Sequence, residues 1–586
     1  MPSPASRPAA AAEALTRVAL GLILVPHGLG KLFGHDLAHT ALNFRHLGWP
    51  APLGFAVAVG CVEVFGGLAL AAGLFTRAAA AAILAEMTGI CALVLWPRWE
   101  WVHRGMEYPF LMGVLALSFV LRGGGAYSLD RVLARLWHAP APTRANGPVT
   151  NVTALIDAAP FGGLQRMVLL LCGLAALLDG LDLQSIGLAA PGIIASLHVP
   201  PRAFGLVFSA ALLGLMLGAF GLGPLADRIG RRAILIGASI TFAVFTFATG
   251  FVASFPALLG MRFLAGIGLG GAMPSFIALG TEYAPRRLRG VAVALLWTGF
   301  PLGGVVGGLL GARLIPAFGW PSLFYVGGVL PLLLALALLA LLPESIGFLV
   351  ARDPGAPEIG RLLGRITGTT PPAGARFALG EASAPGMPLR QLFTDGRAGA
   401  TLLLWVAFFA IFLMLVTNTA WSPILLHAVG LPVPRAALAM AAFNAGSVVG
   451  TAAAGSLIAR LPPARTLALL SVASAASFAL IGRAAPGFAG VAALQALSGV
   501  FLGAASSGLI ALAALFYPTA GRSTGVGWAM GMGRFGSFLG PLWVAMLVGG
   551  GWAVAATYQA VAVPALVAAV CLLGLGWVRA EMVAAR

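Results

Sequence analysis

Two aspartates three residues apart, Asp179 and Asp182, interrupt a stretch that is otherwise apolar from Met167 to Ile194. The stretch is long enough to span a bilayer, and at about 1.5 Å per residue Asp179 lies roughly 18 Å along it, near mid-membrane. Residues three apart share one helix face, and an ionised carboxylate in hydrocarbon costs at least ~2.5 kcal/mol. We therefore expect this face to contact protein or a watery cavity, where a carboxyl group can take up and release protons. The alternative is a helix-packing aspartate satisfied by a neighbouring hydroxyl group.

Two arginines also lie in apolar stretches. Arg262 precedes glycines at four-residue spacing, Gly266 and Gly270, which permit close helix contact, so Arg262 is expected to face the protein interior. Arg534 lies within residues 527–543, and its guanidinium group cannot lose its charge there, so it needs a carboxylate. Its planar fork suits an aromatic carboxylate whose ring stacks on protein aromatic rings. A fixed ion pair between Arg534 and Asp179 or another acid is the alternative.

The composition indicates a polytopic membrane protein. Hydrophobic residues make up 60% of the chain and charged residues 9%, with a mean hydropathy of +0.96, whereas about a quarter of residues are charged in soluble domains. The net charge of +17 is spread over short arginine clusters between apolar segments, which argues against a nucleic-acid partner. The four cysteines lie singly in apolar runs, so we predict buried thiols and no metal site or cofactor.

The apolar segments define the elements that must position these charges. Four precede residue 138 and twelve follow residue 166, with a long polar loop between the sixth and seventh of the twelve, so we predict an all-α fold in which a four-helix bundle is followed by two six-helix halves. The segments lie near 15–33, 53–75, 78–97 and 108–121, then 167–194, 204–226, 233–253, 256–280, 288–312, 320–342, 399–427, 433–458, 466–482, 487–512, 524–548 and 553–578. The predicted parts are a disordered leader over 1–14, a membrane domain over 15–137, a linker over 138–166, halves over 167–342 and 399–578, and a central cytoplasmic loop over 343–398.

The arginines predict the orientation in the bilayer. If the segment at 167 enters from the cytoplasm, the short inner loops carry nine arginines and the outer loops four, which places both termini inside. The inner arginines are Arg228, Arg231, Arg232, Arg286, Arg287, Arg289, Arg460, Arg465 and Arg522, and the outer ones are Arg202, Arg313, Arg435 and Arg483. We expect an integral protein of a bacterial inner membrane.

A glycine-rich turn between the second and third of the twelve segments carries one acid and several arginines. It runs from Gly221 to Arg232 and includes Asp227, Arg228, Gly230, Arg231 and Arg232. Such charges can pair in one conformation and separate in another, as a gate requires. The run resembles the signature loop of the major facilitator superfamily, and the stretch at Arg262 resembles that superfamily's fourth-helix motif, which implies a link between Arg262 and proton coupling.

Further motifs narrow the resemblance to the aromatic acid/proton symporters, over most of 167–578. They are Asp179-Gly180-Leu181-Asp182, Leu342–Ser345, Trp421–Pro423, and Tyr517 and Pro518 with Arg522 and Arg534. The resemblance implies a twelve-helix fold that moves a small organic acid anion with protons, using Asp179, Asp182, Arg262 and Arg534. Two features depart from the family pattern: Leu181 stands where an aromatic residue is usual, and the second-half loop over 455–465 lacks an acid.

The N-terminal domain has its own intramembrane charges. Lys31, the only lysine in the chain, lies four residues after His27 on one helix face, and Glu63 and Glu86 are acids that could pair with them or relay protons. The pattern over about 15–135 resembles the DoxX family of four-helix membrane proteins. This resemblance implies an accessory or quinone-linked module with a membrane redox partner.

Three functions are compatible with the sequence. The first is proton-coupled symport of an aromatic or related organic acid anion by alternating access, which makes the chain a transporter and not an enzyme. The second is a quinone-linked oxidoreductase assembly that acts through the N-terminal domain, and the third is proton-coupled efflux of drugs or metabolites. ATP-driven transport within this chain is excluded, because a phosphate-binding loop needs a Gly-Lys pair followed by Ser or Thr, and Lys31 is followed by Leu32.

Overall fold

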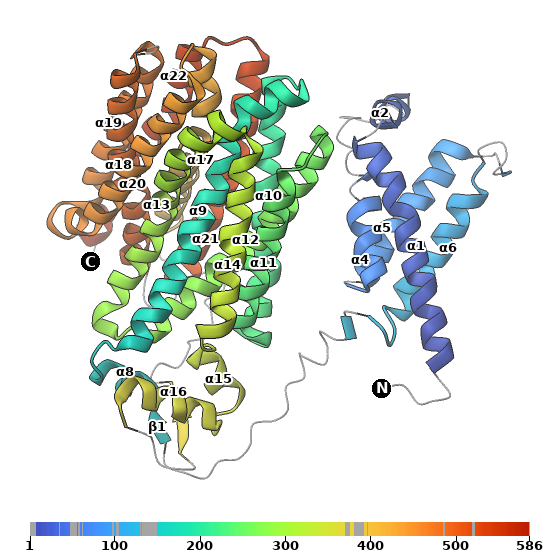
Figure 1. Ribbon diagram of the computed structural model, residues 1–586, viewed down its shortest axis with the longest axis horizontal. Coiled ribbons are helices and arrows are strands. Elements are labelled where there is room, and N and C mark those ends of the chain that lie inside the picture. Colours follow the sequence, from blue (N-terminus) through green and yellow to red (C-terminus); the bar gives the residue numbers. More distant parts are fainter. Residues whose placement is uncertain are drawn as a thin grey trace. The chain divides into compact units, whose positions relative to one another are not determined.

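The computed structural model describes residues 7–33, 36–46, 56, 59–60, 62–74, 76–96, 99–100, 105–128, 130–131, 149–369, 375–379, 392–394, 397–484, 487–517 and 522–584. Over these residues the chain is almost wholly helical, and its contacts divide it into two compact units, Met1–Ala141 and Pro142–Arg586 (Figure 1). Fourteen described helices are long and apolar enough to cross a membrane. The all-α polytopic fold class predicted from the sequence is therefore confirmed.

The first unit is a small helical bundle. Its apolar core includes Leu20, Leu70, Ile83 and Phe119. The elements are α1 (Arg7–Phe33), α2 (Asp36–His46), a π-helical turn η2 (Val62–Gly66) that continues as α4 (Gly67–Ala72), α5 (Thr76–Gly89) with its π-helical extension η3 (Ile90–Leu95), and α6 (Glu107–Arg122). The α2 helix lies between two predicted segments and was not expected.

The first helix corrects the prediction of a disordered leader over 1–14. Helix α1 begins at Arg7, so residues 7–14 are helical. The alanines over residues 9–12 have the highest helix propensity of any residue type, and Pro8 is favourable in the first turn, where its missing N–H is not needed. Composition rich in Ala and Pro therefore indicated a helix start here.

The second unit contains twelve long helices in two sets of six, each close to its predicted segment. The first set is α9 (Gly163–Leu197), α10 (Phe204–Ile229), α11 (Arg231–Thr249), α12 (Phe255–Tyr283), α13 (Arg286–Phe318) and α14 (Pro321–Leu341). The second set is α17 (Ala398–Ala428), α18 (Val433–Arg460), α19 (Pro463–Ala484), α20 (Phe488–Phe516), α21 (Arg522–Gly549) and α22 (Val554–Ala584).

Parts of the predicted linker and of the predicted central loop fold together. The strand β1 (Val149–Asn151) pairs in parallel with β2 (Arg376–Ala378). The adjoining helices are α8 (Val152–Ala158), α15 (Ile346–Arg352) and α16 (Pro357–Thr367). Helix α16 is amphipathic, because its buried residues are Ile359, Leu362, Leu363 and Ile366, and they share a core with Val152 and Ile156 of α8. The predicted boundaries 138–166 and 343–398 thus include ordered structure.

Glycines set the closest helix contact in the first half. A side chain at Gly180 of α9 would collide with the carbonyl group of Phe300 in α13, and one at Gly303 of α13 would collide with the carbonyl oxygen of Leu177 in α9. The two helices therefore cross with their backbones in contact. The face of α13 that carries Gly303 is therefore a packing surface.

The two halves touch one another at the helix ends remote from α8, α15 and α16 (Figure 1). The hydroxyl group of Ser209 on α10 donates to the carbonyl oxygen of Phe538 on α21 at 2.9 Å. A Cβ atom at Gly308 on α13 would lie 2.8 Å from the carbonyl oxygen of Ala437 on α18. These contacts close the space between the halves at one end.

The close crossing of α9 and α13 generates the first prediction. Gly303→Ala should lower the free energy of unfolding by about 1–3 kcal/mol, because the new methyl group forces the two backbones apart. Gly290→Ala on the same helix is the matched control: a Cβ there meets no atom within 4 Å, and the change should be neutral or slightly stabilising. Thermal unfolding of the detergent-solubilised protein measures both, and equal melting curves for the two variants would contradict the assignment.

Candidate functional site

Asp182 and Arg262 form a fully buried ion pair between α9 and α12. The Arg262 Nη2 atom lies 2.7 Å from Asp182 Oδ2 and its Nη1 atom 3.1 Å from Oδ1, and both side chains are 0% exposed. The hydroxyl group of Thr246 on α11 also donates to Asp182 Oδ1, and the guanidinium carbon lies 5.8 Å from the centroid of the Phe324 ring on α14. Within the pair the two charges cancel, and the fork-to-fork geometry fixes α9 against its neighbours.

Asp179, one turn earlier on α9, has a different environment. It is 5% exposed and lines a cavity between the halves, and its Oδ1 atom has no hydrogen-bond partner among the described residues. Arg534 of α21 lines the same cavity and lies within electrostatic reach of Asp179. No ion pair within 4.0 Å joins the two in the described part of the chain; instead Arg534 Nη2 contacts Met273 Sδ at 2.6 Å. The two charges that were predicted to bind proton and anion therefore face one space without being bonded to each other.

The cavity between the halves has an empty volume of about 1240 Å³, part of it open to solvent. Aromatic rings from both halves line it: Phe276, Trp297, Phe300, Phe412 and Phe443. Small polar side chains form another part of its wall: Thr419, Asn444, Ser447, Thr451, Ser506, Ser507 and Ser537. A cavity with one arginine, several rings and a set of hydroxyl groups can hold a flat anion that carries its own hydroxyl groups.

A pair of amide side chains bridges the halves beside this cavity. Gln184 Nε2 donates to Asn444 Oδ1 at 3.1 Å, and Asn444 Nδ2 donates to Gln184 Oε1 at 2.7 Å. The close approach of Gly304, whose added Cβ would lie 2.5 Å from Asn444 Cγ, makes room for the pair. Sequence reasoning missed these residues, although a buried amide in an apolar helix was an available signal.

The glycine-rich turn engages acids that the sequence reasoning did not connect with it. Asp227 pairs at 3.3 Å with Arg231, four residues later in the chain, and Arg231 also pairs with Glu282 at the end of α12. The backbone N–H of Arg232 donates to Glu344 Oε1 at 3.0 Å. Gly230 has φ +106°, a conformation that favours glycine, and it alone separates α10 from α11. Arg228 lies in the last turn of α10.

The motif formed by Tyr517, Pro518 and Arg522 lies only partly within the described residues. Tyr517 is buried, and its ring fills the space where a side chain at Gly525 would lie. Burial raises the pKa of the Tyr517 phenol, so it packs as a neutral aromatic group. Arg522 begins α21, but its side chain and Pro518 lie outside the described residues.

In the first unit the structure brings together three of the four predicted residues. Lys31 of α1 forms an ion pair with Glu63 of η2, and Glu86 of α5 lies within electrostatic reach of both. His27 lies one turn before Lys31, and its ring centroid is 6.3 Å from that of Tyr108 on α6.

Comparison with known proteins agrees with this arrangement. The model of the Major Facilitator Superfamily matches residues 172–481, and the DoxX model matches residues 12–96. The 4-hydroxybenzoate transporter PcaK of Pseudomonas putida is 37% identical over 436 residues, which cover 74% of this chain and 97% of that protein. A gallate transporter of Pseudomonas putida is 35% identical over 430 residues, which cover 73% of this chain and 96% of that protein.

A solved structure shows the same fold. It is a bacterial homolog of the human lysosomal transporter Spinster in an inward-facing and unoccupied conformation, with a TM-score of 0.55 and 18% identity over 72% of this chain and 99% of that one. At this identity the likeness concerns the fold alone.

The buried pair generates the second prediction. Arg262→Gln should lower the free energy of unfolding by about 3–5 kcal/mol, because it leaves the Asp182 carboxylate buried without a counter-charge. The double variant Asp182→Asn/Arg262→Gln should lose less unfolding free energy than the two single variants lose together. Unfolding in mixed micelles measures each, with Arg313→Gln on the exposed end of α13 as the control. If the loss in the double variant equals the sum of the losses in the single variants, the pair does not hold α9 to α12.

Proposed function

The chain belongs to the major facilitator superfamily of transporters, and we propose that it is a symporter that moves an aromatic acid anion together with protons. One observation carries the proposal: Arg534 and Asp179, from opposite halves, face one cavity lined by aromatic rings. The substrates in the names of the two relatives, 4-hydroxybenzoate and gallate, each combine an aromatic ring, a carboxylate and ring hydroxyl groups. The lining of this cavity has a complementary group for each of these parts.

The anion binds to the fixed positive charge of the cavity. A guanidinium group donates two parallel hydrogen bonds to a carboxylate, so Arg534 exchanges its contact with Met273 for the substrate. Phe276, Phe412 and Phe443 are placed to pack on the aromatic ring. Hydroxyl groups on the ring then reach the polar wall of the cavity, where Ser447 and Ser507 offer both donors and acceptors.

Charge balance in the cavity couples the proton to the anion. Arg534 alone neutralises one negative charge, so a bound carboxylate and an ionised Asp179 together would leave the site with one excess negative charge. Protonation of Asp179 removes that excess, and each ligand thereby favours binding of the other. Asp182 is already neutralised by Arg262, so we assign this pair the role of holding Asp179 toward the cavity.

The contacts that close one end of the structure support alternating access. The halves touch at the ends remote from α15 and α16 (Figure 1). We infer that the cavity opens toward the end that carries these helices. The arginine distribution supports the proposal that this end of the second unit faces the cytoplasm. The pairs of Arg231 with Asp227 and Glu282 lie at this same end and are the contacts we propose to rearrange when the halves rock.

The charge-balance mechanism generates the third prediction, for uptake of radiolabelled 4-hydroxybenzoate into proteoliposomes. Asp179→Asn should abolish accumulation driven by a pH gradient but retain substrate exchange across the membrane, because the site stays neutral without a proton. Arg534→Ala should weaken binding by roughly 10- to 100-fold and lose both activities, since a charge-assisted hydrogen bond contributes about 1.5–3 kcal/mol.

Glu358→Gln is the control for the acid and Arg313→Ala the control for the arginine, because both positions are exposed. Both control variants should transport normally. Accumulation by Asp179→Asn at the level of the unaltered protein would remove Asp179 from proton coupling. Resistance to toxic compounds without uptake of any acid would favour efflux instead of symport.

The polar wall generates the fourth prediction. Ser447→Ala should weaken binding of 4-hydroxybenzoate about tenfold and leave binding of benzoate nearly unchanged, because only the first ligand has a ring hydroxyl group to lose its partner. Ser456→Ala, on the exposed face of the same helix, is the matched control. Competition between the two acids for uptake measures the ratio of their affinities. An equal loss of affinity for both acids would show that Ser447 does not contact the ring hydroxyl group.

A further inference from the structure

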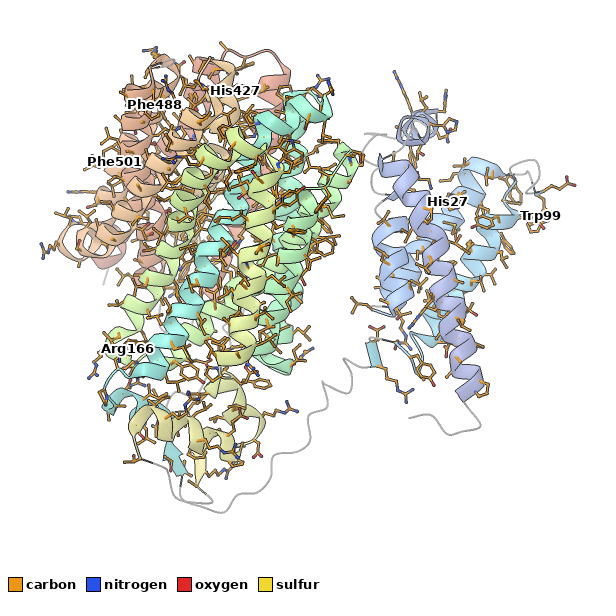
Figure 2. All side chains as sticks on the ribbon, viewed as in Figure 1. His27, Trp99, Arg166, His427, Phe488 and Phe501 are labelled. Carbon is orange, nitrogen blue, oxygen red and sulfur yellow. The ribbon has the colours of Figure 1, made fainter. Side chains whose placement is uncertain are left out.

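A cluster of ionisable side chains lies in the first unit, and the transport cavity does not include it. Lys31 of α1 and Glu63 of η2 form an ion pair in which Glu63 is 3% exposed and Lys31 20%. Glu86 of α5 adds a second carboxyl group. Tyr108 of α6 lies within electrostatic reach of Glu63, and His27, which Figure 2 shows on α1, lies beside Tyr108. Each of the four apolar segments of the unit therefore contributes a polar or charged side chain.

The backbone brings these groups together. A Cβ atom at Gly28 would lie 2.7 Å from the carbonyl oxygen of Gly60 and 2.8 Å from Glu63 Cβ, so a side chain there would push the second segment away from α1. Glu63 lies in the π-helical turn Val62–Gly66, a form that occurs mostly as single turns and is frequent at functional sites. Because Gly28 has no side chain, the π-helical turn can approach α1 closely, and Glu63 then lies against Lys31.

In the described part of the unit, three of the four oxygens of the two carboxyl groups lack a hydrogen-bond donor. Neither oxygen of Glu86 has a hydrogen-bond donor among the described residues, and the same holds for Glu63 Oε2. The carboxyl group of Glu86 lies within electrostatic reach of that of Glu63. Two ionised carboxylates offer only acceptors, so a hydrogen bond between the two groups needs a proton on one of them. Lys31 compensates one negative charge, and a second one in an apolar segment of a membrane protein would be costly.

We propose that Glu63 and Glu86 share one exchangeable proton beside Lys31, and that the first unit thereby contains a proton-binding site of its own. The proton comes from water and returns to it, and no electron is transferred. Charged or titratable groups that face the pair, among the described residues, are Lys31 and His27 from α1 and Tyr108 from α6. The site is neutral when occupied and carries one negative charge when empty.

The ligand of this site is a proton rather than a metal ion. Within the described residues no group of three or more His, Cys, Asp or Glu side chains is arranged to hold a metal. The ammonium group of Lys31 occupies the position where a cation would bind Glu63, and a metal ion there would be repelled by it.

Carbodiimide labelling of the full-length protein in proteoliposomes tests the proposal. N,N′-dicyclohexylcarbodiimide reacts with protonated carboxyl groups in apolar surroundings, and peptide mass spectrometry locates the label. We expect label on Glu63 or Glu86 at acidic pH and a loss of label as the pH rises. Glu86→Gln should abolish the label on Glu63 as well, because the remaining carboxylate is then ionised and paired with Lys31.

The sharpest variant is Lys31→Met. Removal of the ammonium group leaves no charge to hold either carboxyl group ionised, so label should appear on both residues and persist to higher pH. Glu107→Gln, an exposed carboxyl group at the start of α6, is the matched control and should leave the labelling unchanged.

An infrared difference spectrum between acidic and alkaline protein gives a second measurement that needs no reactive probe. The unaltered protein should show a protonated-carboxyl band that Glu86→Gln lacks. The absence of that band from the unaltered protein, or label on Glu63 in Glu86→Gln equal to that in the unaltered protein, would overturn the proposal.

Discussion

An ionised side chain within the apolar thickness of a membrane must be paired or must face water, and this constraint organises the second unit. Asp182 and Arg262 satisfy it by pairing, and Thr246 completes the bonding of the carboxylate. Asp179 and Arg534 satisfy it by facing a cavity. Since Asp179 lies on the first half and Arg534 on the second, relative motion of the halves changes the distance between these charges. In the symport mechanism that we propose, substrate and proton act on the same electrostatic balance that this motion alters.

The sequence identified the charges but not their partners. Four charged residues stand out because each lies in an apolar segment: Asp179, Asp182, Arg262 and Arg534. The helix ends are predicted from the same contrast between apolar and polar residues. Which aspartate meets which arginine depends on how α9 packs against α12, and three residues of helix separate two different environments. The hydroxyl-bearing residues of the cavity give no comparable signal: serines such as Ser506 occur in apolar helices bonded to their own backbone, here to the carbonyl oxygen of Gly503 at 3.1 Å.

The ordered part of the central segment was missed for a related reason. Its strand Arg376–Ala378 pairs with Val149–Asn151, and the two strands are far apart in the chain. Three-residue strands of this kind carry no periodic pattern, so only the partner defines them. Helix α16 did carry a signal, since Ile359, Leu362, Leu363 and Ile366 follow helical spacing within a polar stretch. The stretch 343–398 was predicted to be a loop from its overall polar composition, and this composition concealed the amphipathic pattern of α16.

The contacts that close one end of the cavity are weak enough to be reversible. Small residues make the close approaches, such as Gly308 against Ala437. Within the described part of the chain few hydrogen bonds cross between the halves, among them that of Ser209 and the pair formed by Gln184 and Asn444. Each such bond contributes about 1 kcal/mol net, so exchanging them costs only a few kcal/mol. That is the scale at which one substrate anion and one proton can shift a two-state equilibrium. A transporter closed by several buried ion pairs would stay in one state, because binding energy of this size could not open it.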